Sequence, residues 1–525
     1  MTLVAIDFGT SNTVVCILDP VTQAPKTLKF DQISRGFSAG AVTHYVVPSL
    51  LYVQARDQLI LGEQVRSRRL GFGQPERLFQ GFKRDLAANF RPPSRLLDDY
   101  SYDVEAIAEL FLTEIFAQVR TQVQDISAVV FTVPVGAFEL YLDWCRDLAA
   151  RLNLPNPQII DESTAAALGY AIAAIGSIVL VIDFGGGTLD LSLVRTSQKQ
   201  HQVMRAAVLA KADIYVGGID IDTWIVEDYL RQAQTTRQEV GEIGWLNLLE
   251  IAERLKIKLT DQPTASESWF DDQNFISHLV TLDRDRLAEI LEQNQLLEQL
   301  RQALDETLAI AASAGVAKSQ IQQVLMVGGS SQLVAIQQLL VSYFGKAKVK
   351  LDQPFTAVGF GALRLDQTVA IDDYLHHGYA IRLWEPYSRS YSYYPLFAKG
   401  LPYPSKRDEP LVLQVASDGQ TEIRLDIGEI GEICEAEVSY NREGQMTSSQ
   451  LQRHTKFRSL ISPNQVQGVS SSQACLAYLN PPGQTGKDRI EIYFAVTSDR
   501  VLVATVKDLL TQKILLDQVA IAKLN

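Results

Sequence analysis

The chain has 525 residues, of which 46% are hydrophobic and 21% are charged, and its formal net charge is −13. This composition excludes a disordered or fibrous protein, and the length exceeds the roughly 250–300 residues at which single cores stop growing, so we expect several lobes. The negative charge argues against binding nucleic acid through a broad basic surface. An acidic protein can still bind phosphate locally, through backbone amides and a metal ion.

The N-terminus, MTLVAIDFG, has no basic region and reaches Asp7 after a few apolar residues, so it predicts a strand and not a signal peptide. We therefore expect a cytoplasmic location and no membrane partner. The cysteines are far apart and lack the paired spacing of zinc sites or disulfide frameworks, which favours buried thiols. They are Cys16, Cys145, Cys434 and Cys475.

Strands and helices are expected to alternate along the first 365 residues, as they do around covered parallel sheets. Expected strands cover residues 4–6, 13–18, 128–133 and 324–327, and expected helices cover residues 138–152, 246–259 and 287–314. Residues 163–182 carry no charge and are long enough to cross a bilayer. Because the stretch is Ala-rich, then interrupted by Gly176, then β-branched, it predicts a buried helix, a turn and a buried strand.

One short motif occurs twice. Residues 4–18 (VAIDFGTSNTVVCIL) and 180–194 (LVIDFGGGTLDLSLV) both predict a strand, an aspartate, a glycine turn and a second strand. Glycine lets backbone amides approach phosphate oxygens, and such turns form anion-binding concavities. Because a carboxylate beside such a turn would repel phosphate, we expect Mg²⁺, which prefers oxygen ligands, between them. Asp7 and Asp183 are therefore predicted to face one metal across one cleft.

Either copy alone is typical of an ordinary β-hairpin, and a third glycine pair at Gly328 and Gly329 strengthens the phosphate interpretation. The motifs IDFGTSNT, VVFTVP, IIDESTAAALGY, VLVIDFGGGTLDLSLV, VGGIDID, LMVGGSSQL and AVGFGAL follow one another along the chain. In this order they resemble the actin-like ATPase superfold and, within it, the 70-kilodalton heat-shock chaperone family of the DnaK type. The resemblance covers residues 1–365 densely and the rest more loosely.

This resemblance implies an α/β actin-like ATPase fold of two ribonuclease-H-like lobes in residues 1–368. An interdomain linker (369–377) and a C-terminal all-β sandwich domain (378–525) would follow. The implied ligands are ATP and ADP with Mg²⁺, and the implied reaction is hydrolysis of ATP to ADP and phosphate. Polypeptide clients or one dedicated protein partner are the implied partners, together with a nucleotide-exchange factor.

The site residues follow position by position from the resemblance. Residues implied in catalysis are Lys83, Glu162, Asp183, Thr188 and Asp7, of which Asp7, Glu162 and Asp183 would hold magnesium mostly through water. Residues implied in nucleotide binding are Gly9, Thr10, Ser11, Asn12, Gly185, Gly186, Gly187, Asp190, Gly217, Gly218, Glu253, Lys256, Thr260, Gly328, Gly329 and Ser330. Lys83 would orient the attacking water and stabilise the charge on the transferred phosphoryl group; without the resemblance it would be an ordinary solvated lysine.

Several positions depart from the family pattern. Gln332 stands where the family usually has an arginine that stacks on adenine, and Phe355 stands where it usually has an aspartate, so an altered base pocket is expected. Pro134 matches a proline proposed as a nucleotide switch, but Leu142 replaces its arginine partner.

Three further departures lie between the two copies of the motif. Ser163 replaces a proline, and Asp161 replaces an asparagine. Gln158 replaces an arginine that contacts J-domains, which argues against a J-domain partner.

Beyond residue 377 short alternating strands predict an all-β domain of about 145 residues. Hairpins are expected at Asp418-Gly419, at residues 442–444 and at residues 498–499, and the Ser- and Gln-rich segment 446–473 is expected to be an irregular loop. The linker is acidic and poor in leucine, and its His376-His377 pair predicts an exposed feature and not a metal site. No lid of helices follows, so rapid release of bound peptide, or a different purpose, is expected.

Three functional hypotheses remain from the sequence. The first is an ATP-hydrolysing chaperone-like protein whose β domain binds extended polypeptide under nucleotide control. The second is an ATP-binding scaffold with weak hydrolysis and one dedicated partner. The third, a sugar kinase or actin-like filament, is disfavoured because the β domain is unusual in those proteins.

Overall fold

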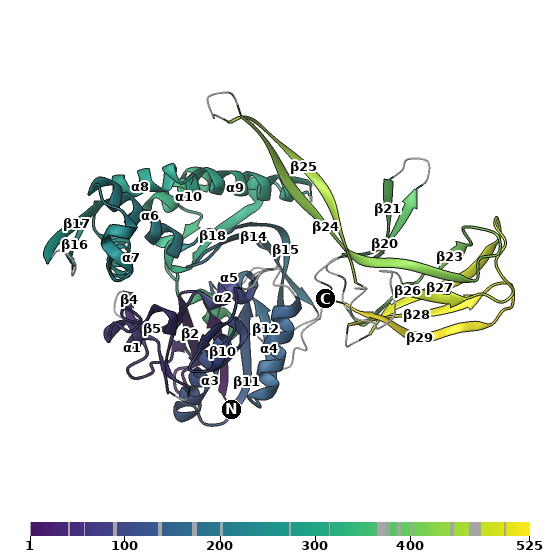
Figure 1. The fold of residues 1–525 in the computed structure, drawn as a ribbon, viewed down its shortest axis with the longest axis horizontal. Helices are drawn as coiled ribbons and strands as arrows, with labels where there is room; N and C mark the ends of the chain where they lie inside the picture. The colour runs from purple at the N-terminus through teal and green to yellow at the C-terminus, as the bar shows by residue number, and fades with distance from the viewer. Residues whose placement is uncertain are drawn as a thin grey trace. The chain divides into compact units, whose positions relative to one another are not determined.

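The structure is a computed structural model of the chain, drawn in Figure 1. It describes residues 2–39, 42–56, 58–87, 92–134, 139–170, 176–199, 203–271, 275–313, 315–364, 375, 378–385, 390–398, 401, 403–440, 446–460, 474–497 and 500–524. Two compact units are present: the first comprises Met1–Ala137 and Tyr141–Val369, and the second comprises essentially Ala370–Asn525. Each is described by itself.

The first unit begins with a mixed sheet in the order β12-β11-β1-β2-β5-β4, with β3 paired to β2. Its strands are β1 (Thr2–Phe8), β2 (Asn12–Leu18), β3 (Pro25–Thr27), β4 (Arg35–Ala39), β5 (Val42–Pro48), β11 (Ile126–Val133) and β12 (Pro157–Asp161). Strand β1 runs antiparallel to β2 and parallel to β11. Both β1 and β11 are almost wholly apolar because each is covered on two faces.

A second sheet repeats this arrangement in the order β15-β14-β13-β18-β19. Its strands are β13 (Ile178–Phe184), β14 (Leu189–Lys199), β15 (Val203–Ile214), β18 (Ile321–Val327) and β19 (Val349–Lys350). Strand β13 is antiparallel to β14 and parallel to β18, as β1 is to β2 and β11. The sequence repeat is therefore a structural repeat.

Helices pack against both faces of these sheets (Figure 1). They are α1 (Glu63–Ser67), α2 (Phe82–Ala87), α3 (Val104–Gln122), α4 (Glu139–Arg151), α5 (Glu162–Gly169), α6 (Gly218–Gln232), α7 (Arg237–Asp261), α8 (Arg284–Gln293), α9 (Leu296–Ser313), α10 (Val334–Phe344) and α11 (Ala357–Ala362). Alternate residues of β13 enter different cores: Leu180 packs with α6–α10, whereas Val181 packs with α5, α11 and the first sheet.

The two sheets are joined through α5 and α11, whose backbones touch. A Cβ at Gly361 would lie 1.7 Å from the Ala165 carbonyl oxygen, and one at Gly169 would lie 1.9 Å from that of Ala357. Only small residues permit this approach, which gives the Ala- and Gly-rich motifs around both helices a structural reason.

Smaller elements complete the first unit. They are β6 (Leu50–Ala55), β7 (Gln58–Leu61), β8 (Leu78–Gln80), β9 (Arg95–Leu97), β10 (Tyr100–Tyr102), β16 (Thr264–Asp271), β17 (Ile276–Asp283) and 3₁₀ turns at Pro75–Arg77, Lys318–Gln320 and Gly329–Gln332. The predicted strands and the helix at 138–152 are confirmed within small shifts of their ends. The helix predicted at 246–259 is confirmed as the C-terminal part of α7, which begins already at Arg237 and is interrupted by a non-helical Gly241 with a φ of 68°. The predicted single helix 287–314 is wrong: Gln295 takes a positive φ of 59°, so α8 ends and α9 begins there.

The second unit contains two antiparallel sheets in the orders β21-β20-β24-β25, with β26 on β24, and β22-β27-β28-β29, with β23 on β27. Their strands are β20 (Gly378–Glu385), β21 (Ser390–Phe397), β22 (Ser405–Lys406), β23 (Leu411–Gln414), β24 (Glu422–Tyr440), β25 (Met446–Ser459), β26 (Ala474–Tyr478), β27 (Asp488–Val496), β28 (Val501–Asp508) and β29 (Ile514–Lys523). Residues of both sheets, such as Ile381 and Ile492, share one hydrophobic core.

Two predictions for this unit are wrong. The strands on either side of Asp418-Gly419 do not form a hairpin, because β23 pairs with β27 and β24 pairs with β20, β25 and β26. Residues 446–459 form β25 and not an irregular loop, since they pair along β24; residues 461–473 lie outside the described residues. Turns 442–444 and 498–499 also lie outside them, although the flanking strands pair as hairpins do.

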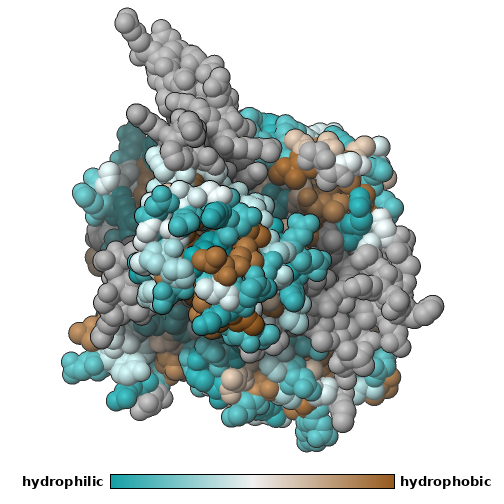
Figure 2. Space-filling view, turned by 90° about the vertical axis from the view of Figure 1, so that its right-hand side faces the viewer, coloured by the Kyte–Doolittle hydropathy of each residue, from teal (hydrophilic) through white to brown (hydrophobic). Residues whose placement is uncertain are grey.

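The predicted linker 369–377, including His376 and His377, lies outside the described residues except for Leu375, which is buried in the core of the second unit. In the described part of the chain no helix is long and apolar enough to cross a membrane. The uncharged stretch 163–182 instead forms α5 and β13, as predicted, although residues 171–175 between them are not described. On the face drawn in Figure 2, hydrophilic residues predominate and hydrophobic residues gather in small patches.

Candidate functional site

The two glycine turns of the sequence repeat lie against each other. A Cβ at Gly186, in the turn after β13, would lie 1.8 Å from Ser11 Oγ and 2.8 Å from Ser11 Cβ, in the turn after β1. A Cβ at Gly187 would lie 2.9 Å from Thr10 Cγ2. A Cβ at either position would displace side chains of the opposite turn, and the predicted meeting of the two turns is present in the structure.

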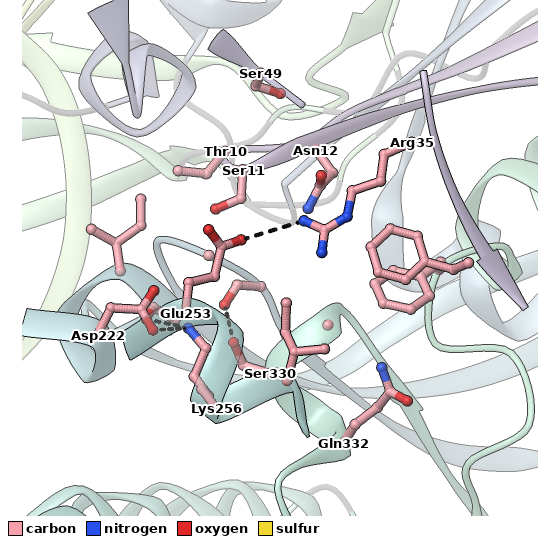
Figure 3. A pocket seen from close by; sticks show the side chains of 18 of the residues that line it. Thr10, Ser11, Asn12, Arg35, Ser49, Asp222, Glu253, Lys256, Ser330 and Gln332 are labelled. Atoms are coloured by element: carbon pink, nitrogen blue, oxygen red, sulfur yellow. Dashed lines mark hydrogen bonds and ion pairs between the residues drawn. The ribbon is translucent and has the colours of Figure 1, made fainter. Parts of the chain in front are cut away.

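A cavity of about 470 Å³ opens beside these turns, within the size range of roughly 300–1,000 Å³ that is typical of small-molecule sites. Figure 3 shows it from close by. The predicted site residues that line it are Thr10, Ser11, Asn12, Gly185, Gly186, Gly218, Glu253, Lys256, Thr260, Gly329 and Ser330.

The other predicted glycines hold the loops together without lining the cavity. A Cβ at Gly217 would lie 2.3 Å from the Gly186 carbonyl carbon, and one at Gly9 would lie 2.1 Å from the Asn12 carbonyl oxygen. Gly328 has a positive φ of 80°, and a Cβ there would lie 2.3 Å from the Phe184 carbonyl oxygen. These positions set how closely the loops approach.

Lys83 and Glu162 form a buried ion pair. Lys83 lies on α2, Glu162 opens α5, and the Lys83 ammonium donates a hydrogen bond of 2.7 Å to Glu162 Oε1. Lys83 is only 7% exposed, so the alternative of a solvated lysine is excluded. Burial opposes its charge, but Glu162 and Asp7 outweigh burial and raise the pKa of Lys83 above its usual value.

The predicted metal carboxylates are crowded together in the same buried region. Burial and Glu162 raise the pKa of Asp7 to about 6, although the Thr132 hydroxyl donates a 2.9 Å hydrogen bond to it. Burial, followed by Glu162, raises the pKa of Asp183 well above its usual value. One lysine cannot compensate these charges, and a divalent cation would.

The donor chemistry fits magnesium held largely through water. All three carboxylates are oxygen donors, which Mg²⁺ prefers, and Mg²⁺ usually keeps several of its waters. Among the described residues no three acidic, histidine or cysteine side chains lie close enough together to hold a metal directly. A cation here would therefore need its own waters and the ligand's phosphates to complete its shell.

Asp190 and Thr188 lie at the edge of this cluster. Asp190 on β14 is the antiparallel partner of Asp183, and burial followed by its neighbour Asp213 raises the pKa of Asp190 to about 7. The Thr188 side chain is hydrogen-bonded to Asp190, and the Thr188 carbonyl accepts a 3.0 Å hydrogen bond from the Gly185 amide. Thr188 thus closes the second turn.

Residues on α7 form a wall of the cavity, but each of them already contacts another residue of this chain. Glu253 accepts a 2.5 Å hydrogen bond from Arg66, and Lys256 lies 2.6 Å from Asp222 (Figure 3). Thr260 donates its hydroxyl to the Ile257 carbonyl.

Ser330 reaches the second turn directly, because its hydroxyl donates a 2.9 Å hydrogen bond to the Gly185 carbonyl. The two departures in the base pocket, Gln332 and Phe355, both line the cavity. The Phe355 ring stacks on that of Phe37.

Arg35, Phe37, Arg66 and Asp222 are cavity residues that the sequence did not indicate. They come from β4, α1 and α6. Asp222 ends the VGGIDID motif, and no local pattern marks the other three. Leu142, in the place of an expected arginine, is 3% exposed and packs into the core of the first sheet.

A family model described as "Hsp70 protein" matches residues 94–366, which is more than half of the chain. The chain belongs to the Hsp70 family. Members of this family are ATP-binding proteins of the actin-like ATPase fold, which agrees with the duplicated sheets of the first unit.

This Hsp70 chain is also similar to the "Heat shock 70 kDa protein, mitochondrial" of Solanum tuberosum. The two are 27% identical over 389 residues, which cover 69% of this chain and 54% of the relative. The chain therefore spans about half the length of the curated relative that it matches.

Proposed function

We propose that the protein is a Mg²⁺-dependent ATPase that hydrolyses ATP to ADP and phosphate and uses this cycle to control binding of extended polypeptide. One observation carries the proposal: two glycine turns from duplicated sheets meet beside one cavity, with a buried Lys83–Glu162 pair and further buried carboxylates next to them. Loss of either turn or of the lysine should therefore abolish the same activity.

Each residue has a role that its environment supports. The amides of the turns containing Thr10 and Gly186 bind phosphate oxygens, as glycine-rich turns do. Magnesium, when bound through Asp7, Glu162 and Asp183, neutralises charge on the phosphates. Lys83, oriented by Glu162, stabilises the charge that develops as water attacks the γ-phosphorus and the bond to ADP breaks.

The second unit offers a surface that suits an extended polypeptide. Strand β21 lies at the end of its sheet order among the described strands, and an edge strand can accept a further strand through main-chain hydrogen bonds. Tyr391 on β21 and Trp384 on the neighbouring β20 are 51% and 54% exposed, with ring centroids 5.0 Å apart. Client polypeptides, or one dedicated partner, are the proposed ligands, and an exchange factor and a cytoplasmic location stay predictions.

The alternative of an ATP-binding scaffold with weak hydrolysis is favoured by Leu142. Because Leu142 is buried in the hydrophobic core, this position has no guanidinium that could act as the partner of Pro134 in the family's nucleotide switch. A scaffold of this kind would bind its partner without regard to nucleotide.

The ATPase rate with and without an extended, unstructured peptide separates these functions. For the chaperone-like protein we expect the peptide to change the rate, and Trp384→Ser to lower peptide affinity while leaving the basal rate unchanged. Tyr478→Ser, at another exposed aromatic side chain, is the control. An ATPase rate that the peptide does not change favours the scaffold. A wild-type protein without ATPase activity contradicts the ATPase proposal.

A further inference from the structure

The cavity wall has two kinds of surface. One part consists of hydroxyl, amide and glycine groups from the two turns, which suit phosphates. Another part carries the aromatic rings of Phe37 and Phe355. A ligand that fills both parts needs an anionic end and a flat, apolar end, as a nucleoside triphosphate has.

The aromatic part is a stack built from segments far apart in the sequence. The ring centroids of Phe37, on β4, and Phe355, just before α11, are 4.7 Å apart with an interplanar angle of 24°. The Phe355 ring also packs closely over Gly329, where a Cβ would lie 3.1 Å from it. The guanidinium carbon of Arg35 lies 5.1 Å from the Phe37 ring centroid, which extends the stack.

Arg35 forms only a long ion pair, with Glu253, which a dashed line marks in Figure 3. Its closest approach to Glu253 is 4.0 Å, whereas Arg66 binds the same carboxylate at 2.5 Å. The Arg35 side chain is 28% exposed, lines the cavity and extends into it in Figure 3. Its planar group is therefore positioned against an aromatic ring and still accessible to a ligand.

We propose that Arg35, supported by Phe37 and Phe355, stacks on the base of the bound nucleotide and makes the site prefer nucleotides to base-free phosphates. The proposal rests on the proposed nucleotide-binding function. A guanidinium plane stacks on flat π-systems, which the compact ammonium of lysine does not do. The base is thus recognised by its face, and the phosphates are recognised separately by the turns.

The test compares ATP with inorganic triphosphate, both with Mg²⁺, by calorimetric titration of the full-length chain. Arg35→Lys keeps the charge and removes the plane. Because base stacking contributes about 5- to 150-fold in affinity, we expect ATP to bind more weakly by that factor while triphosphate affinity changes less than about twofold. Phe37→Leu, which removes the supporting ring, should weaken ATP binding in the same selective way.

Arg56→Lys is the matched control, because the Arg56 guanidinium lies the same 5.1 Å from the ring of Tyr100 and does not line the cavity. It should leave both affinities unchanged. Equal losses of ATP and triphosphate affinity in Arg35→Lys would show that only charge matters and would overturn the proposal, as would unchanged ATP affinity. A wild-type protein that binds neither ligand would instead contradict the proposed function.

Discussion

Replacing Lys83 by methionine removes a buried ammonium that lies against the acidic cluster while keeping most of the side-chain volume. The pair that is lost has a 2.7 Å hydrogen bond, and the side chains of Lys83 and Glu162 are 9% and 12% exposed. Removing one preorganised group that stabilises transition-state charge costs about 10²–10³ in kcat. We expect Lys83→Met to lower the single-turnover rate of ATP hydrolysis by this factor.

Stability changes as well, and it must be separated from catalysis. Breaking a buried ion pair by removing one partner costs about 3–5 kcal/mol, because the other charge stays buried. The double variant Lys83→Met/Glu162→Gln leaves no such charge, so its free energy of unfolding should recover while its ATPase rate stays low. Urea unfolding and single-turnover hydrolysis, measured on the same preparations, distinguish the two effects.

Lys258→Met is the control, because Lys258 also forms a 2.5 Å ion pair, with Glu267, but its side chain is 44% exposed. Exposed pairs contribute about 0–1 kcal/mol, so neither stability nor rate should change much. A roughly threefold loss of rate is far smaller than the loss expected when such a charge-stabilising group is removed. Folded Lys83→Met that hydrolysed ATP within about threefold of the wild-type rate would therefore show that Lys83 has no catalytic role.

Two further predictions concern packing and pH. Gly361→Ala forces a Cβ to within 1.7 Å of the Ala165 carbonyl oxygen, so thermal unfolding should show that the free energy of unfolding falls by at least about 1–3 kcal/mol. Gly73→Ala is the control and should be nearly neutral, because a Cβ there meets nothing within 4 Å. Equal effects of the two variants would contradict the tight α5–α11 contact. Because burial raises the pKa of Asp7 to about 6 and that of Asp190 to about 7, the folded protein binds more protons than the unfolded chain between about pH 4 and 7, and its stability without ligand should fall as the pH rises through this window. Mg²⁺ with ATP favours the ionised carboxylates, so its stabilising shift in Tm should be larger at pH 8 than at pH 5, and a shift that does not depend on pH would refute this assignment.

The sequence predicted the strands that carry the site because each is an apolar run that ends at a polar residue and glycine. Local signals of this kind fixed β1 and β13, and the repeat itself predicted that Asp7 and Asp183 lie in one region. The interruption at Gln295 was missed because a positive φ at a non-glycine residue leaves no pattern.

Long-range pairing was not predictable from local signals. Strand β24 pairs with β20, β25 and β26 and not with the expected β23. Which strands pair depends on how the whole core of the second unit packs. For the same reason Arg35 and Arg66 could not be assigned to the cavity, since their positions depend on how distant segments pack. The burial of Lys83 likewise required the fold.

The stoichiometry of Mg²⁺-ATP binding, measured by calorimetric titration of the wild-type chain and of Gly186→Ala, tests most directly whether the two turns act as one clamp. One nucleotide should bind per chain. Gly186→Ala should abolish binding in a protein that still unfolds cooperatively, because a Cβ there would lie 2.8 Å from Ser11 Cβ, a contact that rotation of the Ser11 hydroxyl cannot relieve, and would force the turns apart. Two nucleotides per chain, or unchanged binding by folded Gly186→Ala, would contradict a single site shared by both turns.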